Sequence, residues 1–100
     1  MKKRIVIVDD DQDVRSYCSF IIGAMGFEAV AFGEPVDVIN FLSGGEHADA
    51  VLTDLYLPQM SGIDLARLIT GARPDLPVIM MTGHPSCLEE AIADGAGEKR

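Results

Sequence analysis

The chain has 100 residues, 48% of them hydrophobic and 24% charged, which suits one small domain with a single packed core. Its formal net charge of −8 at pH 7 has the wrong sign for a surface that grips the phosphates of nucleic acid, so we expect no direct nucleic-acid binding by this segment. The apolar run near the N-terminus is too short for a signal peptide or a membrane span, and cysteines 18 and 87 lack metal-ligand spacing. We therefore expect a cytoplasmic protein with free thiols and no membrane contact.

Short apolar runs alternate with amphipathic stretches along the chain. The first run, Ile5 to Val8, is continuously β-branched and bounded by charges, which predicts a strand buried on both faces. In chain order, strands are expected at residues 5–8, 28–32, 50–53 and 78–81. Helices are expected between and after them, at residues 13–25, 33–43, 65–72 and 86–93. These four strand-helix units predict an α/β fold with a doubly wound parallel sheet.

Local signals mark where the predicted helices begin and end. Gly26 ends the first helix, Pro35 lies near the first turn of the second, and Gly44 stops it. Ser86 and Glu89 form a capping-box pattern at the start of the last. By the three-four spacing of apolar residues, the inward side chains of the first three helices should be Val14, Tyr17, Cys18, Ile21, Ile22 and Met25, then Val36, Ile39 and Leu42, then Leu65, Leu68, Ile69 and Ala72.

Polar residues follow three of the predicted strands at the point where each ends. Asp9 and Asp10 follow the first strand, Asp54 follows the third and Thr82 follows the fourth. Parallel strands present these ends at one edge of the sheet, where this architecture binds ligands, so the four side chains should converge. Three neighbouring carboxylates repel one another, and Mg²⁺ is the hard cation that accepts a few carboxylates together with phosphate oxygens. The pattern predicts phosphoryl transfer to a carboxylate, with the Thr82 hydroxyl donating to the transferred group.

Three segments together resemble the receiver domains of two-component response regulators, which have a flavodoxin-like fold. They are Ile5 to Asp11 (IVIVDDD), Thr53 to Gly62 (TDLYLPQMSG) and Val78 to Gly83 (VIMMTG), in the order in which receivers carry them. The resemblance covers nearly the whole chain. It implies a signalling domain rather than a conventional enzyme, one that catalyses its own phosphorylation and dephosphorylation.

The resemblance also assigns roles to individual residues. It implies that Asp54 accepts a phosphoryl group from the phosphohistidine of a sensor histidine kinase or a phosphotransfer protein. Asp9, Asp10 and Asp54 would hold Mg²⁺ together with the backbone carbonyl of Tyr56. Thr82 would turn toward phosphorylated Asp54 and so change an output surface.

The chain departs from the receiver pattern at its C-terminus. Receivers carry a fifth strand, a lysine just after it and a fifth helix, and none of these is visible after Gly97, where only Glu98, Lys99 and Arg100 remain. Lys99 precedes the place where that strand should begin, so it is not given the lysine's role. We expect residues 1–100 to be a C-terminally incomplete receiver domain whose fourth strand is an exposed edge that supports a homodimer.

Two other functions use the same residues. A receiver-like interaction module would keep the fold and never take phosphate. A phosphatase similar to the haloacid dehalogenases would use Asp9 and Asp11 as nucleophile and acid, but it leaves Asp54 without a role. For Asp11 and Asp13 the simpler interpretation is the solvated start of a helix, where acids cap the chain and favour the helix dipole.

Overall fold

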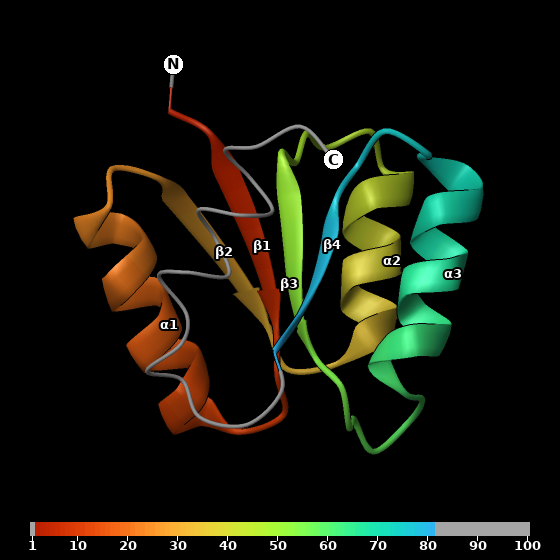
Figure 1. The fold of residues 1–100 in the computed structure, drawn as a ribbon, viewed down its shortest axis with the longest axis horizontal. Helices are drawn as coiled ribbons and strands as arrows, with labels where there is room; N and C mark the ends of the chain where they lie inside the picture. The colour runs from red at the N-terminus through yellow and green to blue at the C-terminus, as the bar shows by residue number, and fades with distance from the viewer. Residues whose placement is uncertain (1, 82–100) are drawn as a thin grey trace.

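The structure, a computed structural model, describes residues 2–81, which form a four-stranded parallel sheet covered by helices on both faces (Figure 1). The strands are β1 (Arg4–Val8), β2 (Glu28–Phe32), β3 (Ala50–Asp54) and β4 (Val78–Met81). The helices are α1 (Gln12–Ala24), α2 (Pro35–Ser43) and α3 (Gly62–Ala72). The predicted doubly wound α/β sheet is confirmed, while the expected helix at 86–93 and Thr82 lie outside the described residues.

The sheet has the strand order β2-β1-β3-β4, with α1 on one face and α2 and α3 on the other (Figure 1). Side chains of successive strand residues alternate between the two faces, so β1 supplies both halves of the core. Val6 and Val8 pack with α2 and α3, whereas Ile5 and Ile7 pack with α1. All four are fully buried, which confirms that the first strand is covered on both sides.

Side-chain and glycine caps set the helix ends. Asp11 caps α1, its carboxylate accepting the Asp13 N–H at 2.9 Å, and Ser61 caps α3 in the same way through the Asp64 N–H at 3.1 Å. Gly26, just beyond α1, has φ of +91°, a conformation that side chains disfavour. None of the helices within residues 2–81 has the length and apolar character that crossing a bilayer requires.

The inward faces of the helices differ from the prediction at four positions. Tyr17, Val36 and Leu68 are 45%, 51% and 53% exposed, and Ala72 is exposed as well, so the expectation that they face the core is wrong. In α2 the buried stripe runs through Val38 and Leu42, four residues apart, which turns Val36 toward solvent. The same four-residue spacing of buried residues fixes the inner faces of α1 and α3 and leaves Tyr17 and Leu68 beside them.

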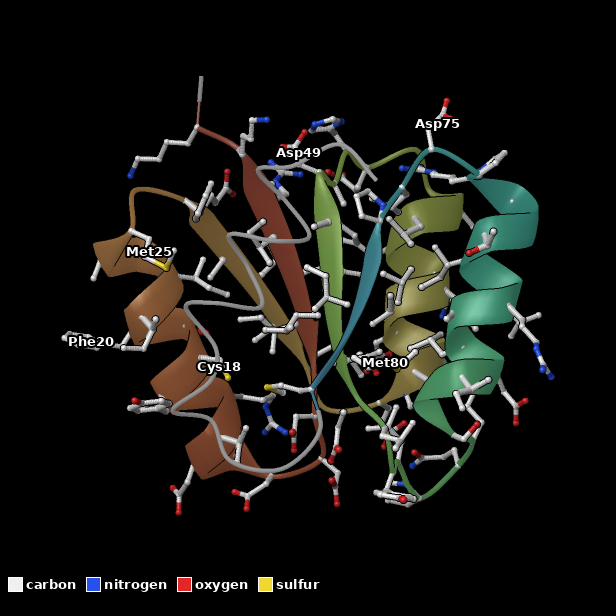
Figure 2. All side chains as sticks on the ribbon, in the orientation of Figure 1. Cys18, Phe20, Met25, Asp49, Asp75 and Met80 are labelled. Atoms are coloured by element: carbon white, nitrogen blue, oxygen red, sulfur yellow. The ribbon has the colours of Figure 1, made fainter. Side chains whose placement is uncertain are left out.

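Cys18 belongs to the core between α1 and the sheet. Its side chain points inward while that of Phe20 points away from the molecule (Figure 2), and its Sγ lies 3.7 Å from the sulfur of Met81. Burial, with a smaller effect from the charge of Asp9, raises the pKa of the Cys18 thiol to about 11. The thiol is therefore protonated at neutral pH and packs as an apolar group, as predicted for a free buried cysteine.

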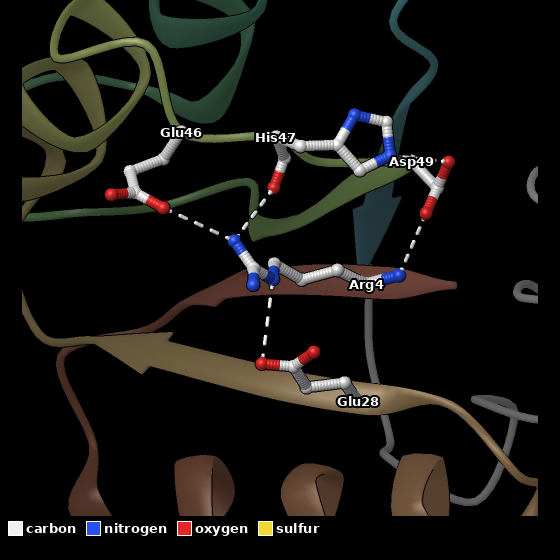
Figure 3. Close-up of polar contacts among 5 residues, drawn as sticks. All are labelled: Arg4, Glu28, Glu46, His47 and Asp49. Atoms are coloured by element: carbon white, nitrogen blue, oxygen red, sulfur yellow. Dashed lines mark hydrogen bonds and ion pairs between the residues drawn. The ribbon is translucent and has the colours of Figure 1, made fainter. Parts of the chain in front are cut away.

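The amino ends of the strands are tied together by Arg4, the first residue of β1 (Figure 3). Its guanidinium lies 3.4 Å from a Glu28 carboxylate oxygen on β2 and 3.3 Å from Glu46, and it donates to the His47 carbonyl at 3.2 Å. Its backbone N–H donates to Asp49 Oδ2 at 2.7 Å, and His47 Nε2 lies 2.9 Å from Asp49 Oδ1. This network joins β1 and β2 to the segment that enters β3. It lies at the end of the sheet opposite Asp9, Asp10 and Asp54.

Candidate functional site

Three carboxylates meet at the carboxyl ends of the two central strands. Asp9 and Asp10 follow β1, and Asp54 is the last residue of β3. One carboxylate oxygen from each lies within 4.8 Å of the others. The chain leaves β1 for β2 on one side and returns to β3 on the other, and such a reversal point is where open parallel sheets bind ligands. The predicted convergence of these three side chains is confirmed.

Asp9 is the buried member of this acidic cluster, with 4% of its surface exposed. Its Oδ1 accepts the Asp11 N–H at 2.9 Å, and its own N–H donates to the Phe32 carbonyl at 3.2 Å. Burial raises the pKa of the Asp9 carboxyl above its ordinary value; the hydrogen bond from Asp11 opposes this rise, and the charges of Asp54 and Asp10 add to it. Without a counterion the cluster is electrostatically unfavourable.

The acidic cluster has the donor set that Mg²⁺ prefers. Mg²⁺ binds oxygen ligands octahedrally at about 2.0–2.1 Å, which places ligand oxygens roughly 3–4 Å apart. The 4.8 Å limit on the separations of the Asp9, Asp10 and Asp54 oxygens is close to this span. The three carboxylates therefore fit a magnesium ion, with open positions left for water or phosphate oxygens.

Asp54 stands at the base of a short loop that leads into α3. Its Oδ1 accepts the backbone N–H of Tyr56 at 3.3 Å, and the Tyr56 side chain is 78% exposed. The loop is closed by the Gly62 N–H, which donates to the Leu55 carbonyl at 2.7 Å. A Cβ at position 62 would lie 2.4 Å from the Asp54 carbonyl oxygen, so glycine is required here. The half-buried Asp54 carboxylate therefore stands at the base of a loop that is closed by its own hydrogen bonds.

Two residues of the site escaped sequence reasoning. Gly62 entered the prediction only as the last residue of the segment from Thr53 to Gly62, and its close approach to the Asp54 carbonyl was not foreseen. Arg15 received no role, yet its Nη1 donates to the Asp9 carbonyl at 2.7 Å. The one signal in the sequence was the position of Arg15, about one turn into a helix that begins just after Asp9, Asp10 and Asp11.

The remaining predicted site residues divide into three groups. Tyr56 lies beside Asp54 through its N–H, and its carbonyl as a metal ligand stays a prediction. Asp11 has the structural role that was favoured, because its carboxylate caps α1. Because the Asp11 carboxylate caps the helix, the structure does not support a phosphatase that uses Asp9 and Asp11 as its catalytic pair. Thr82 lies outside the described residues.

Comparison with known proteins gives the same family at every level. The response regulator receiver domain family matches residues 5–98. The chain is 35% identical to the C4-dicarboxylate transport transcriptional regulatory protein DctD of Rhizobium meliloti, over 92% of this chain and 20% of DctD. It is 36% identical to the sensory transduction protein RegX3 of Mycolicibacterium smegmatis, over 88% of this chain and 38% of RegX3. The chain thus spans between a fifth and two fifths of the length of these relatives.

Solved structures agree with the sequence relatives. A CheY-like response regulator receiver domain protein from Methanospirillum hungatei superimposes with a TM-score of 0.78 at 28% identity, over 93% of this chain and 74% of that one. A receiver domain protein from Clostridium thermocellum gives a TM-score of 0.75, also at 28% identity, over 90% and 71%. With its flavodoxin-like sheet and its acidic cluster, the chain belongs to the response regulator receiver domain family, the signalling module of two-component systems.

Proposed function

We propose that Asp54 is the phosphoacceptor of this receiver domain and that Mg²⁺ bound by Asp9, Asp10 and Asp54 supports its phosphorylation. The observation that carries the proposal is the approach of the three carboxylate oxygens to within 4.8 Å at the carboxyl ends of β1 and β3. Of the three, Asp9 is buried, Asp10 is exposed and Asp54 is half-buried at the base of the loop that leads into α3. Asp54 is assigned as the acceptor because the segment from Thr53 to Gly62 resembles the one that carries the phosphoacceptor in the receiver family.

The reaction is the transfer of a phosphoryl group from a phosphohistidine to a carboxylate oxygen of Asp54. The new oxygen–phosphorus bond forms as the nitrogen–phosphorus bond breaks, and the imidazole of the donor keeps the electron pair. The Tyr56 N–H bonded to Asp54 Oδ1 orients the carboxylate for attack. Hydrolysis of the resulting acyl phosphate at the same site would end the signal, so the domain would catalyse both of its own covalent steps.

The donor atoms for the metal come from four residues. Asp9, Asp10 and Asp54 would supply carboxylate oxygens, and Tyr56 its backbone carbonyl. When bound, Mg²⁺ neutralises the crowded carboxylates and the charge that develops on the phosphoryl oxygens. The hydrogen bond from the Asp11 N–H holds the Asp9 carboxylate in place for this role.

Thr82 follows β4, next to β3 in the sheet, and we assign its hydroxyl the role of donating to the phosphoryl group on Asp54. Its reorientation would transmit the new charge to an output surface. The partner would be a sensor histidine kinase or a phosphotransfer protein, acting in the cytoplasm, where a free thiol such as that of Cys18 persists. No direct contact with nucleic acid or membrane is assigned to this segment.

A homodimer through β4 completes the proposal. Within residues 2–81, β4 pairs with β3 alone, and all four of its residues are only half-buried. A strand edge of this kind offers unpaired backbone groups to a second chain. Light scattering on the purified chain should give the mass of a dimer, and a monodisperse monomer would contradict the expectation.

The phosphoacceptor is tested by intact-mass spectrometry after incubation with a small phosphodonor. We expect the chain to gain the mass of one phosphoryl group in the presence of Mg²⁺ and none with EDTA. Asp54→Asn should gain none in either condition, whereas Asp13→Asn, which changes an exposed acid outside the cluster, should behave as the unaltered chain does. A chain that gains no phosphate at all would be the interaction module instead.

A further inference from the structure

The guanidinium of Arg15 lies at the edge of the acidic cluster without pairing with any of its carboxylates. Arg15 Nη1 donates to the main-chain carbonyl of Asp9 at 2.7 Å, and the contact is partly buried. That carbonyl belongs to the peptide that joins Asp9 to Asp10, and a peptide group is planar. Holding the oxygen therefore sets the direction in which the chain continues into Asp10.

Asp9 and Asp10 are held in different ways. The Asp9 carboxylate accepts the Asp11 N–H, and the Asp9 N–H donates to Phe32, so both groups of this buried residue are fixed locally. Asp10 is exposed, yet its carboxylate lies within reach of those of Asp9 and Asp54. The hydrogen bond from Arg15 restrains the peptide through which Asp10 is attached.

A glycine makes room for this arrangement. A Cβ built on Gly33, just beyond β2, would lie 3.0 Å from Arg15 Nη1 and 3.5 Å from its Cζ. The absence of a side chain at Gly33 lets the guanidinium lie against the backbone at the end of β2. Its φ is not in the left-handed region, so alanine is tolerated by the backbone and acts only by displacing the guanidinium.

We infer that Arg15 is a positioning residue for the divalent cation, acting through the Asp9–Asp10 peptide, and that Gly33 keeps its place open. The inference rests on the proposed metal site and deepens it, because it names what orients an exposed ligand. An effect through charge alone has the opposite sign: removing a positive charge near a cation site strengthens cation binding. A positioning role predicts weaker binding.

The test measures Mg²⁺ affinity by isothermal titration calorimetry without a phosphodonor, so that the outcome does not depend on whether Asp54 accepts phosphate. Arg15→Gln should weaken binding by about tenfold, the lower end of the range for residues that orient metal ligands. Arg15→Lys, which keeps a donor and the charge, should recover part of the affinity. Arg67→Gln removes the same charge from the 79%-exposed side chain on α3 and should leave the affinity unchanged.

Gly33→Ala provides a second and independent arm. It should weaken Mg²⁺ binding several-fold in the unaltered chain and have no effect when Arg15→Gln is already present, because the displaced group is then gone. Thermal unfolding in EDTA, run on every variant, separates folding defects from changes in metal affinity. Unchanged or tighter binding by Arg15→Gln, or equal effects of Gly33→Ala in both backgrounds, would overturn the inference.

Discussion

Asp9 is a buried carboxylate, and its placement costs the fold stability. A carboxylate that is 4% exposed and lies beside two others has no packing purpose, and burial raises its pKa. Such a group is tolerated where function requires it, and its unfavourable energy is released when a cation binds. The stability of the chain should therefore depend on divalent cations through this side chain.

Asp9→Asn tests this dependence. Asparagine keeps an oxygen that accepts the Asp11 N–H but removes the buried charge. We expect the variant to unfold several degrees higher than the unaltered chain in EDTA, in line with about 4–8 °C per kcal/mol for a domain of this size. In Mg²⁺ the unaltered chain should gain thermal stability and the variant much less, as circular dichroism melting will show.

The control for this comparison is Asp13→Asn, an exposed acid in the first turn of α1. It should lower the melting temperature in EDTA slightly, because it removes a negative charge from the start of α1, and it should leave the gain from Mg²⁺ unchanged. A lower melting temperature for Asp9→Asn in EDTA would mean that the charge of Asp9 stabilises the fold, contrary to this account.

Sequence periodicity predicted every strand and helix within residues 2–81, because each strand is a short apolar run and each helix has strong boundary residues. The convergence of Asp9, Asp10 and Asp54 followed from the parallel sheet. The prediction that Val36 lies on the inner face of α2 was wrong. A three-four spacing of apolar residues is compatible with two neighbouring stripes on a helix, and only packing against the sheet selects one of them. The contact of Arg15 with Asp9 depends on side-chain direction, which spacing does not encode.

The loop between β3 and α3 should tolerate no side chain at position 62. Gly62→Ala would place a Cβ 2.4 Å from the Asp54 carbonyl oxygen and 3.1 Å from the Leu55 Cα. Backbone atoms cannot yield as a flexible side chain can, so we expect a loss of about 1–3 kcal/mol in the free energy of unfolding. Displacement of Asp54 should also slow phosphorylation. Urea unfolding and the rate of mass gain measure the two effects.

Gly71→Ala is the matched control, since Gly71 lies in the same helix and a Cβ there meets no atom within 4 Å. Alanine favours a helix over glycine, so this variant should be more stable by up to about 1 kcal/mol and phosphorylated at the normal rate. If Gly62→Ala were as stable as Gly71→Ala and were phosphorylated at the same rate, the close approach of Gly62 to Asp54 would not matter for folding or for phosphorylation.

For the molecule as a whole, the two ends of the sheet have opposite electrostatic character. Within residues 2–81 the acids at the carboxyl ends form no ion pair, whereas at the amino ends Glu28 and Glu46 pair with the Arg4 guanidinium and Asp49 accepts the Arg4 backbone N–H (Figure 3). The network at the amino ends joins β1, β2 and the entry to β3, so it stabilises the frame that holds the acidic cluster. This division predicts separate effects of acid pH at the two ends.

Asp49 provides a test of how acid pH affects the network at the amino ends of the strands. Burial alone would raise the pKa of its carboxyl, but the hydrogen bonds from the Arg4 N–H and His47 outweigh burial and lower the pKa below its ordinary value of 3.8. A lowered folded-state pKa contributes stability that is complete above the unfolded-state pKa and disappears as the pH falls through the folded-state value. Asp49→Asn should therefore be less stable at about pH 6 by about 1–2 kcal/mol in urea unfolding.

The difference between Asp49→Asn and the unaltered chain should shrink below about pH 4, where the carboxyl of the unaltered chain becomes protonated. Asp75→Asn, which changes an acid at the same end of the molecule as Asp49 (Figure 2), serves as the control and should show only a small effect. A stability difference for Asp49→Asn that stayed constant from about pH 6 to pH 3 would argue against the lowered pKa.

The proposed function requires that Asp54, rather than either of the neighbouring acids, carries the phosphoryl group. The most direct measurement is reduction of the phosphorylated chain with borohydride, which converts an aspartyl phosphate to homoserine, followed by peptide sequencing in a mass spectrometer. We expect homoserine at position 54 and unmodified Asp9 and Asp10. Homoserine at position 9 or 10, with Asp54 intact, would contradict it.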